Sequence, residues 1–197
     1  MRTPSAAALG AAVLTLVGCG GGPSSAGGQP ARAANPSAPE VTPAGDIPDN
    51  QAFVPYAPPG GGYSVKVPEG WARTASGHAV TFTDKLNSIT MEAVPARVPP
   101  TTGDARRTEV PRLARAAKGF KAGQVSSVTR RAGHAVRITY GSSSKADPVT
   151  GKTRTDAVER YAFFHKGSDV VLTLAGPKGA DNVDPWKIVT DSLRFTR

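Results

Sequence analysis

The chain has 197 residues and a formal net charge of +9, from 24 Lys and Arg against 15 Asp and Glu. The positive charge lies mainly in the later part of the chain, because 22 of these basic residues occur from Tyr63 onward. A single cysteine excludes an intramolecular disulfide and any metal site built from several cysteines. The length allows one domain of ordinary size in addition to terminal segments.

The first 18 residues have the form of a secretory signal peptide. Arg2 and the amino terminus supply positive charge, and residues 6–18 carry no charge. A membrane-spanning helix needs about 20 apolar residues. This shorter, Ala- and Gly-rich run therefore predicts an export signal and not a permanent span, and no later stretch is long and apolar enough to span.

The signal ends in Leu16-Val17-Gly18-Cys19, which resembles the bacterial lipobox. The resemblance implies cleavage after Gly18 and a thioether-linked diacylglyceryl group, with acyl chains such as palmitate, on Cys19. Each buried methylene adds roughly 0.8 kcal/mol to anchoring, so two or three acyl chains hold a protein at a membrane. We expect a lipoprotein on the outer face of the cytoplasmic membrane. The alternative is a cysteine that lies at the end of a signal peptide by chance.

Residues 19–58 differ in composition from the rest of the chain. Gly, Pro, Ser and Ala predominate, and such a segment cannot bury enough apolar surface to offset its chain entropy. We expect a flexible tether that carries the lipid on Cys19. Aromatic residues return at 52–59, where an extended arm could dock on the domain. Residues 59–197 fit a single domain.

Six stretches of this domain alternate apolar and polar residues with a period of two, which is typical of strands with one buried face. The short link Lys166-Gly167-Ser168-Asp169 joins the last two and predicts a hairpin. The predicted strands cover residues 63–68, 79–84, 88–95, 134–141, 157–167 and 169–176.

Residues 104–120 have the spacing of a helix. Gly119 is a plausible end of this helix, and Pro111 marks either a kink or its true start. Its apolar positions are Val110, Leu113 and Ala117.

A second helix is predicted near the carboxyl terminus. Asp184 can cap it, and Pro185 suits the first helical position. The apolar stripe of this helix consists of Trp186, Val189 and Leu193. Ile188 lies outside this stripe. Helices that flank an antiparallel sheet define an α+β domain.

Three stretches resemble PsbP-like domains and the related actinobacterial lipoproteins of the LpqN type. They are YSVKVPEGW at 63–71, VTFTDKLNSITMEAV at 80–94 and PWKIVTDSLRF at 185–195. The resemblance implies an α/β/α sandwich around an antiparallel sheet. It also implies a non-enzymatic binding or accessory module.

The sequence carries no motif that predicts catalysis, a metal or a cofactor. His78, His134 and His165 lie far apart and form no metal-ligand spacing. The nucleophile elbow G-x-S-x-G of serine hydrolases is absent from the sequence. We therefore expect a protein that is not an enzyme. The alternative is an extracytoplasmic hydrolase whose site is assembled from distant residues, for example His165 with a neighbouring acid.

Two groups of residues are candidates for binding. Tyr63 and Trp71 could line a ligand groove, although both also suit the edge of a core. A basic stretch could contact anionic lipid, wall polymer or an acidic envelope protein, or could be a solvated face. Nucleic acid is not expected as the partner of an exported protein. The basic candidates are Arg106, Arg107, Arg112, Arg115 and Lys118.

The sequence therefore favours a membrane-anchored envelope lipoprotein with a non-enzymatic binding or accessory domain. A purely structural envelope protein with no small ligand remains the third alternative.

Overall fold

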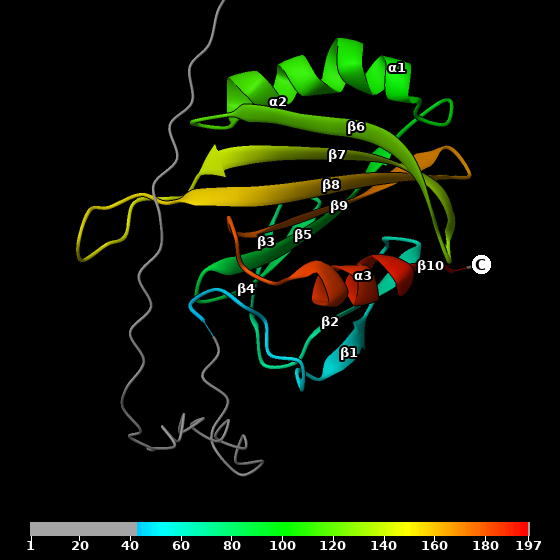
Figure 1. Ribbon diagram of the computed structural model, residues 1–197. Helices are drawn as coiled ribbons and strands as arrows, with labels where there is room; N and C mark the ends of the chain where they lie inside the picture. Colours follow the sequence, from blue (N-terminus) through cyan, green and yellow to red (C-terminus); the bar gives the residue numbers. More distant parts are fainter. Residues whose placement is uncertain (1–42, 197) are drawn as a thin grey trace, which may run out of the picture. The chain divides into compact units, whose positions relative to one another are not determined.

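The computed structural model describes residues 43–196 (Figure 1). The strands are β1 (Phe53–Tyr56), β2 (Tyr63–Pro68), β3 (Ala72–Ser76), β4 (Ala79–Asp84), β5 (Asn87–Pro95), β6 (Lys121–Arg130), β7 (Gly133–Ser143), β8 (Thr155–His165), β9 (Ser168–Pro177) and β10 (Arg194–Phe195). The helical segments are α1 (Thr102–Asp104), the π-helical turn η1 (Ala105–Glu109), α2 (Val110–Ala116) and α3 (Val183–Asp191). Among these residues, no helix is long and apolar enough to cross a membrane.

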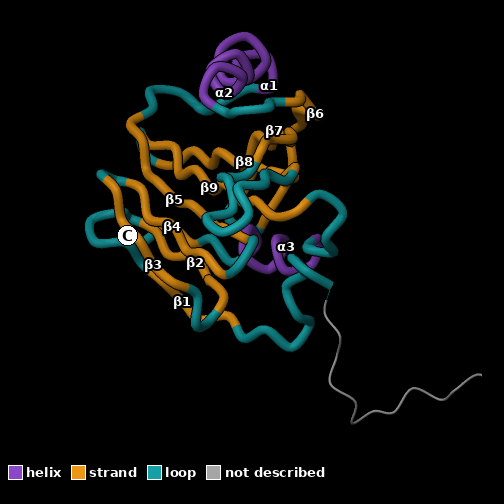
Figure 2. Tube along the Cα trace, turned by 90° about the vertical axis from the view of Figure 1, so that its left-hand side faces the viewer, coloured by secondary structure: helices purple, strands orange, loops and turns teal. Residues whose placement is uncertain are grey.

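Seven of the strands form one antiparallel sheet in the order β3-β4-β5-β9-β8-β7-β6. The helices lie on its two faces: α1, η1 and α2 above it and α3 below it in Figure 1, with the same separation visible from the side in Figure 2. The domain is thus an α+β sandwich, which confirms the predicted fold class. The predicted hairpin is also confirmed, because Lys166 and Gly167 connect paired β8 and β9 with positive φ angles of 46° and 82°.

A second, small sheet has the order β1-β2-β10. The strand β2 lies outside the seven-stranded sheet and pairs with β1 and with the two residues of β10. Its alternating side chains are the reason for its position, because Tyr63, Val65 and Val67 are at most 2 % exposed and pack in the main core. The predicted docking arm at residues 52–59 thus includes a strand, β1.

The main core lies between the seven-stranded sheet and the layer formed by β2 and α3. Ile89 and Met91 of β5 and Leu172 and Leu174 of β9 are fully buried there. The burial predicted for the last helix is confirmed, since Trp186 and Val189 are buried and Ile188 is 45 % exposed. Leu193 is also buried, but it lies after the end of α3 at Asp191.

The start of α3 differs from the sequence prediction. Asn182 and not Asp184 occupies the N-cap, and Pro185 is the third helical residue and not the first. The Asn182 side chain makes no capping hydrogen bond. It is used elsewhere: its amide donates to the carbonyl of Gly45 at 3.0 Å, and its oxygen accepts from the amide N–H of Ile47 at 2.8 Å.

These contacts place residues 43–58 in the folded domain. Ile47 is 3 % exposed and belongs to the main core. The carbonyl of Gly45 also accepts from the side chain of Asn87 at 2.9 Å. Gly45 has a φ of +99°, and a Cβ there would lie 2.4 Å from the ring of Pro177, so only glycine fits. The fold therefore begins before the boundary expected between residues 58 and 59.

The helix predicted over residues 104–120 is present but covers residues 102–116 and contains a wide turn. The N–H of Val110 bonds to the carbonyl of Ala105, five residues earlier. Pro111 follows at once, and a proline has no N–H and clashes with the carbonyl four residues before it. The π-turn accommodates this proline inside the helix. The chain leaves the helix before Gly119, which has a φ of +65°.

Candidate functional site

Tyr63 and Trp71, the candidates either for one ligand groove or for the edge of the core, both pack in or against the main core. Tyr63 is 1 % exposed and belongs to the core, where burial raises its pKa to about 12. It contributes to a hollow near Gly77 and His78, whereas the half-buried Trp71 contributes to a different hollow beside Ile47 and Asn87. The two residues therefore do not form a common groove. Cys19, the predicted site of lipid attachment, lies outside the described residues.

All five basic candidates are exposed. Arg106 and Arg107 lie in η1, Arg112 and Arg115 lie in α2, and Lys118 follows α2. Three of them are engaged locally. Arg107 pairs with Asp104 at 2.6 Å and Arg112 with Glu109 at 2.5 Å. Arg106 donates to the carbonyl of Val125 at 2.7 Å. Within residues 43–196, Arg115 and Lys118 have neither an ion pair nor a side-chain hydrogen bond, so of the five candidates they are the least engaged within the domain.

The histidines are not assembled into a site in the part of the chain that the structure describes. His165 stacks on Phe195 with ring centroids 4.2 Å apart, and no carboxylate of residues 43–196 is hydrogen-bonded to it. His78 and His134 are exposed. No group of three or more potential metal ligands was found among the described residues.

A pocket of about 510 Å³ lies between the helical segment and the sheet. Alternate residues of a strand share one face, so four adjacent strands each contribute two side chains to its floor. The floor consists of Glu92 and Val94 from β5, Asp169 and Val171 from β9, Arg160 and Ala162 from β8, and Val136 and Ile138 from β7.

The pocket exists because the α1–α2 segment covers only part of this face of the sheet. Leu113 and Ala105 pack on Val136 and Ile138 of β7 in a small second core. The helix therefore lies over β7 and β6, and side chains of β8, β9 and β5 line the cavity beside it. Figures 1 and 2 show the helix on this face of the sheet. The roof residues are Asp104, Ala105, Thr108, Glu109 and Arg112, and the loop after β5 forms the mouth with Val98, Pro99 and Pro100.

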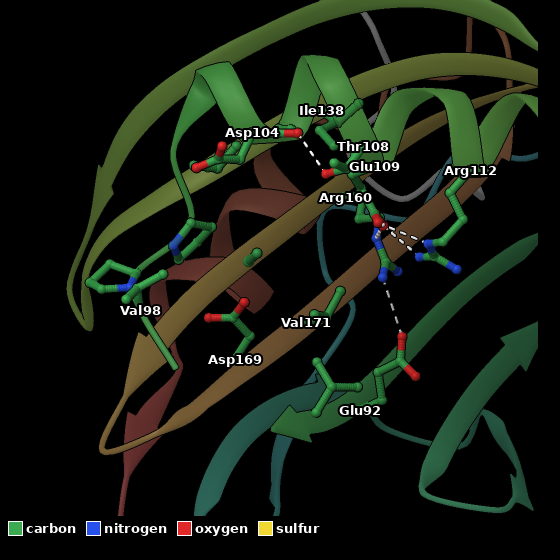
Figure 3. A pocket seen from close by; sticks show the side chains of 16 residues that line it. Glu92, Val98, Asp104, Thr108, Glu109, Arg112, Ile138, Arg160, Asp169 and Val171 are labelled. Carbon is green, nitrogen blue, oxygen red and sulfur yellow. Dashed lines mark hydrogen bonds and ion pairs between the residues drawn. The ribbon is translucent and has the colours of Figure 1, made fainter. Parts of the chain in front are cut away.

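One end of the pocket holds a closed network of charges (Figure 3). Arg160 Nε lies 2.9 Å from Glu109 Oε1, its Nη2 lies 3.4 Å from Glu92 Oε1, and its Nη1 donates to the hydroxyl of Thr173 at 2.9 Å. Arg112 donates to both oxygens of Glu109. Burial raises the pKa of Glu109, but the hydrogen bond from Arg112 and the charges of Arg160 and Arg112 outweigh burial, so this pKa lies below its usual value.

Asp169 lies apart from this network, toward the mouth of the pocket near Val98 (Figure 3). Its Oδ1 atom is buried and has no hydrogen-bond partner. No Lys, Arg or His of residues 43–196 lies within ion-pair distance of it. Burial, with no opposing charge, raises the pKa of this carboxyl above its ordinary value. An isolated carboxylate with a desolvated oxygen is the least satisfied polar group of the pocket.

The sequence prediction missed this pocket. Glu92, Arg160 and Asp169 occupy polar positions of alternating strands, which predict a solvent-facing surface and not a site. A signal is nevertheless present, because three strands each carry a charged residue on the same face as valines or alanines.

Together, the strand order and the helices define an α/β/α sandwich of the PsbP-like fold class, with a cavity beneath its α1–α2 segment. No family model matches the chain, and no curated protein matches it in sequence.

Solved structures match the fold at low sequence identity. The Ran-binding protein Mog1p of Saccharomyces cerevisiae has a TM-score of 0.52 and 12% identity, over 74% of this chain and 96% of its own. The cyanobacterial PsbP protein CyanoP of Synechocystis sp. PCC 6803 has a TM-score of 0.50 and 15% identity, over 81% and 97% of the two chains. LpqN of Mycobacterium tuberculosis, described as involved in cell envelope biogenesis, has a TM-score of 0.41 and 16% identity, over 76% and 93%.

Proposed function

We propose that this domain is a binding module whose ligand site is the pocket between the α1–α2 segment and the sheet. The observation that carries the proposal is the uncovered part of the sheet face, where apolar and charged side chains line one cavity of about 510 Å³. Pockets for small molecules have volumes of about 300–1,000 Å³, mostly apolar walls and a few placed polar groups. This pocket has the same construction.

The branched aliphatic centre of the pocket suits the apolar part of a small ligand. Val94, Val136, Ile138 and Val171 form much of its floor. Val98 at the mouth is 68 % exposed, and a bound molecule would remove part of that apolar surface from water. The charged network around Arg160 fixes the roof above the floor and thereby keeps the cavity open.

A fold does not fix a function, so the neighbours contribute only a general expectation. The yeast neighbour is described as Ran-binding, which is consistent with a scaffold for binding and does not transfer its partner to this chain. An extracytoplasmic hydrolase built on His165 gains no support from the surroundings of that residue.

We propose further that the domain is held at the outer face of the cytoplasmic membrane. The support is in the sequence: a signal-like leader over residues 1–18, and the lipobox-like Leu16-Val17-Gly18-Cys19. Residues beyond Cys19 would connect the lipid to the domain, which includes residues 43–58. Anionic lipid, wall polymer or an acidic envelope protein would be the partner of the basic helix.

A fluorescence experiment tests the ligand pocket. N-phenyl-1-naphthylamine is a neutral apolar dye that becomes bright when it leaves water, and we expect it to bind the protein at one site. Ala162→Leu places three more carbon atoms on the floor of the pocket and should reduce dye binding at least tenfold. Ala114→Leu makes the same change on the exposed side of α2 and serves as the control. Equal dye binding by all three proteins would rule out the pocket as the site.

A further inference from the structure

The charges of the pocket are compensated with one exception. Glu92 and Glu109 face Arg160, and Glu109 also binds Arg112. Asp104 accepts hydrogen bonds from Thr101 at 2.7 Å and from Arg107 at 2.6 Å. Only Asp169, among the charged residues that line the pocket, has neither an ion pair nor a hydrogen bond to its side chain.

This distribution disfavours an anionic ligand. All three nitrogens of the Arg160 guanidinium already have oxygen partners, so an incoming carboxylate or phosphate would compete with Glu92 and Glu109 for them. The same anion would be repelled by Asp169. The protein as a whole carries a net charge of +9, yet the unpaired charge inside this cavity is negative.

An N–H donor with a positive charge would complete the site. The Asp169 carboxylate has no ion pair or hydrogen bond and its Oδ1 is buried, so its charge is uncompensated, and a charge-assisted hydrogen bond from an ammonium group to the carboxylate is stronger than one between neutral groups. Quaternary ammonium groups are held by cages of aromatic rings. No aromatic side chain is among the described residues that line this pocket, so an amine that retains its N–H groups is the better match.

The position of Asp169 sets the orientation of such a ligand. Asp169 lies near the loop that forms the mouth, and Val171 follows it along the floor (Figure 3). Ala162 of β8 is the cross-strand partner of Val171. An amine bound at Asp169 would direct its apolar part along Val171 and beneath the helix. Resting on the ligand pocket proposed above, we propose that this pocket binds a small amphipathic primary amine, with its ammonium group on Asp169 and its apolar part on the aliphatic floor.

Three probes of equal chain length test the proposal: n-decylamine, 1-decanol and decanoate. Each is titrated into the full-length protein carrying bound N-phenyl-1-naphthylamine, and displacement of the dye is measured. We expect n-decylamine to displace the dye at a concentration at least tenfold lower than 1-decanol does, and decanoate to be the weakest of the three.

Asp169→Asn supplies the decisive comparison. In this variant the advantage of n-decylamine over 1-decanol should disappear, while 1-decanol itself binds as well as before. Asp49→Asn removes one negative charge from an exposed position and should preserve the advantage. Circular dichroism and the thermal midpoint confirm that each variant is folded.

The outcomes separate the two proposals. If dye and 1-decanol bind and Ala162→Leu blocks them, but n-decylamine has no advantage or keeps it in Asp169→Asn, the amine proposal is wrong and the ligand pocket stands. If the dye does not bind, or Ala162→Leu leaves its binding unchanged, the ligand pocket fails and the amine proposal fails with it.

Discussion

Arg160 of β8 connects the sheet to the overlying helix through Glu109, with 2.9 Å between Nε and Oε1. The Arg160 side chain is 14% exposed and that of Glu109 27% exposed, so both ions are largely removed from water. A partly buried ion pair contributes little net stability when it is intact, but removal of one partner leaves the other charge without compensation. The pair therefore fixes the height of the helix above the pocket floor more than it stabilises the domain.

The first prediction follows from this pair. Glu109→Gln should lower the free energy of unfolding at neutral pH by about 1 to 2 kcal/mol, because Arg160 and Arg112 lose their shared counter-charge. Urea unfolding followed by circular dichroism measures the difference. Thr108→Ala, a change at the adjacent exposed position, is the control and should have a smaller effect.

The same variant has a defined pH dependence. The pKa of Glu109 is lowered in the folded protein, so its stabilising contribution is present above its ordinary pKa of 4.5 and is lost as the pH falls through the folded value. The difference between wild type and Glu109→Gln should therefore be largest near pH 7 and shrink in acid. A difference that grows as the pH is lowered would contradict the assignment.

The second prediction concerns Asp169 and has the opposite sign. Its pKa is raised in the folded protein, so the folded state binds the proton more tightly and stability falls as the pH rises above the ordinary value of 3.8. The other ionisable groups of the pocket are Glu92, Asp104, Glu109, Arg112 and Arg160. Asp169→Asn removes an isolated charge and should raise the free energy of unfolding by about 1 kcal/mol at neutral pH.

This gain should vanish below pH 3.8, where the carboxyl is protonated in both folded and unfolded chains. Thermal unfolding of the two proteins at several pH values gives the comparison. A destabilised Asp169→Asn at neutral pH would mean that the carboxylate has a structural partner.

The sequence predicted most of the sheet because burial follows the alternation of side chains. In β9, Val170, Leu172 and Leu174 are buried on one face of the strand, as the period of two requires. The strand β3 was missed because Ala72–Ser76 has no large apolar residue and is exposed throughout. It is a strand only because its backbone pairs with β4 at the sheet edge.

The strand β6 was missed for a different reason. Its register with β7 shifts between Ala122 and Val125, so the alternation is broken at this point. The charged positions of three strands are a signal for the pocket, but they do not locate it, because the pocket depends on strand order. Glu92 and Val171 are neighbours across β5 and β9, two strands far apart in the chain. Local patterns contain no information about that pairing.

The third prediction concerns the segment before β1. Ile47→Ala removes a core side chain that is 3 % exposed, and such truncations cost about 2 to 5 kcal/mol. We expect a marked loss of stability in urea unfolding. Val149→Ala, at a side chain that is 90 % exposed, should have almost no effect. Equal stability of Ile47→Ala and the wild type would show that residues 43–58 are not part of the cooperative fold.

The fourth prediction concerns the lipid anchor proposed at Cys19. Cys19→Ala should abolish labelling by a palmitate analogue, because no sulfur remains to form the thioether, and should leave precursor or release protein into the medium. Mass spectrometry of the wild-type amino terminus should find an acylated Cys19 as the first residue. A mature terminus elsewhere, without acyl mass, would exclude the anchor.

The last prediction concerns the basic residues of the helix. Arg115 and Lys118 are exposed and have no ion pair within residues 43–196, whereas Arg112 is bound to Glu109. We therefore expect these two residues to carry most of any attraction to an anionic membrane, worth about 1 kcal/mol for each charge near the surface.

Binding to vesicles that contain phosphatidylglycerol should be weak, should decrease in Arg115→Glu/Lys118→Glu, and should disappear in about half-molar salt, where screening acts over only a few ångströms. The matched control is Lys145→Glu/Lys152→Glu, which changes the net charge equally on the exposed β7–β8 loop. Protein without the lipid is used, so that the anchor does not hide the effect. An equal loss in both double variants would mean that the vesicles sense only the overall charge. Unchanged binding in the helix variant would assign these residues to a solvated surface.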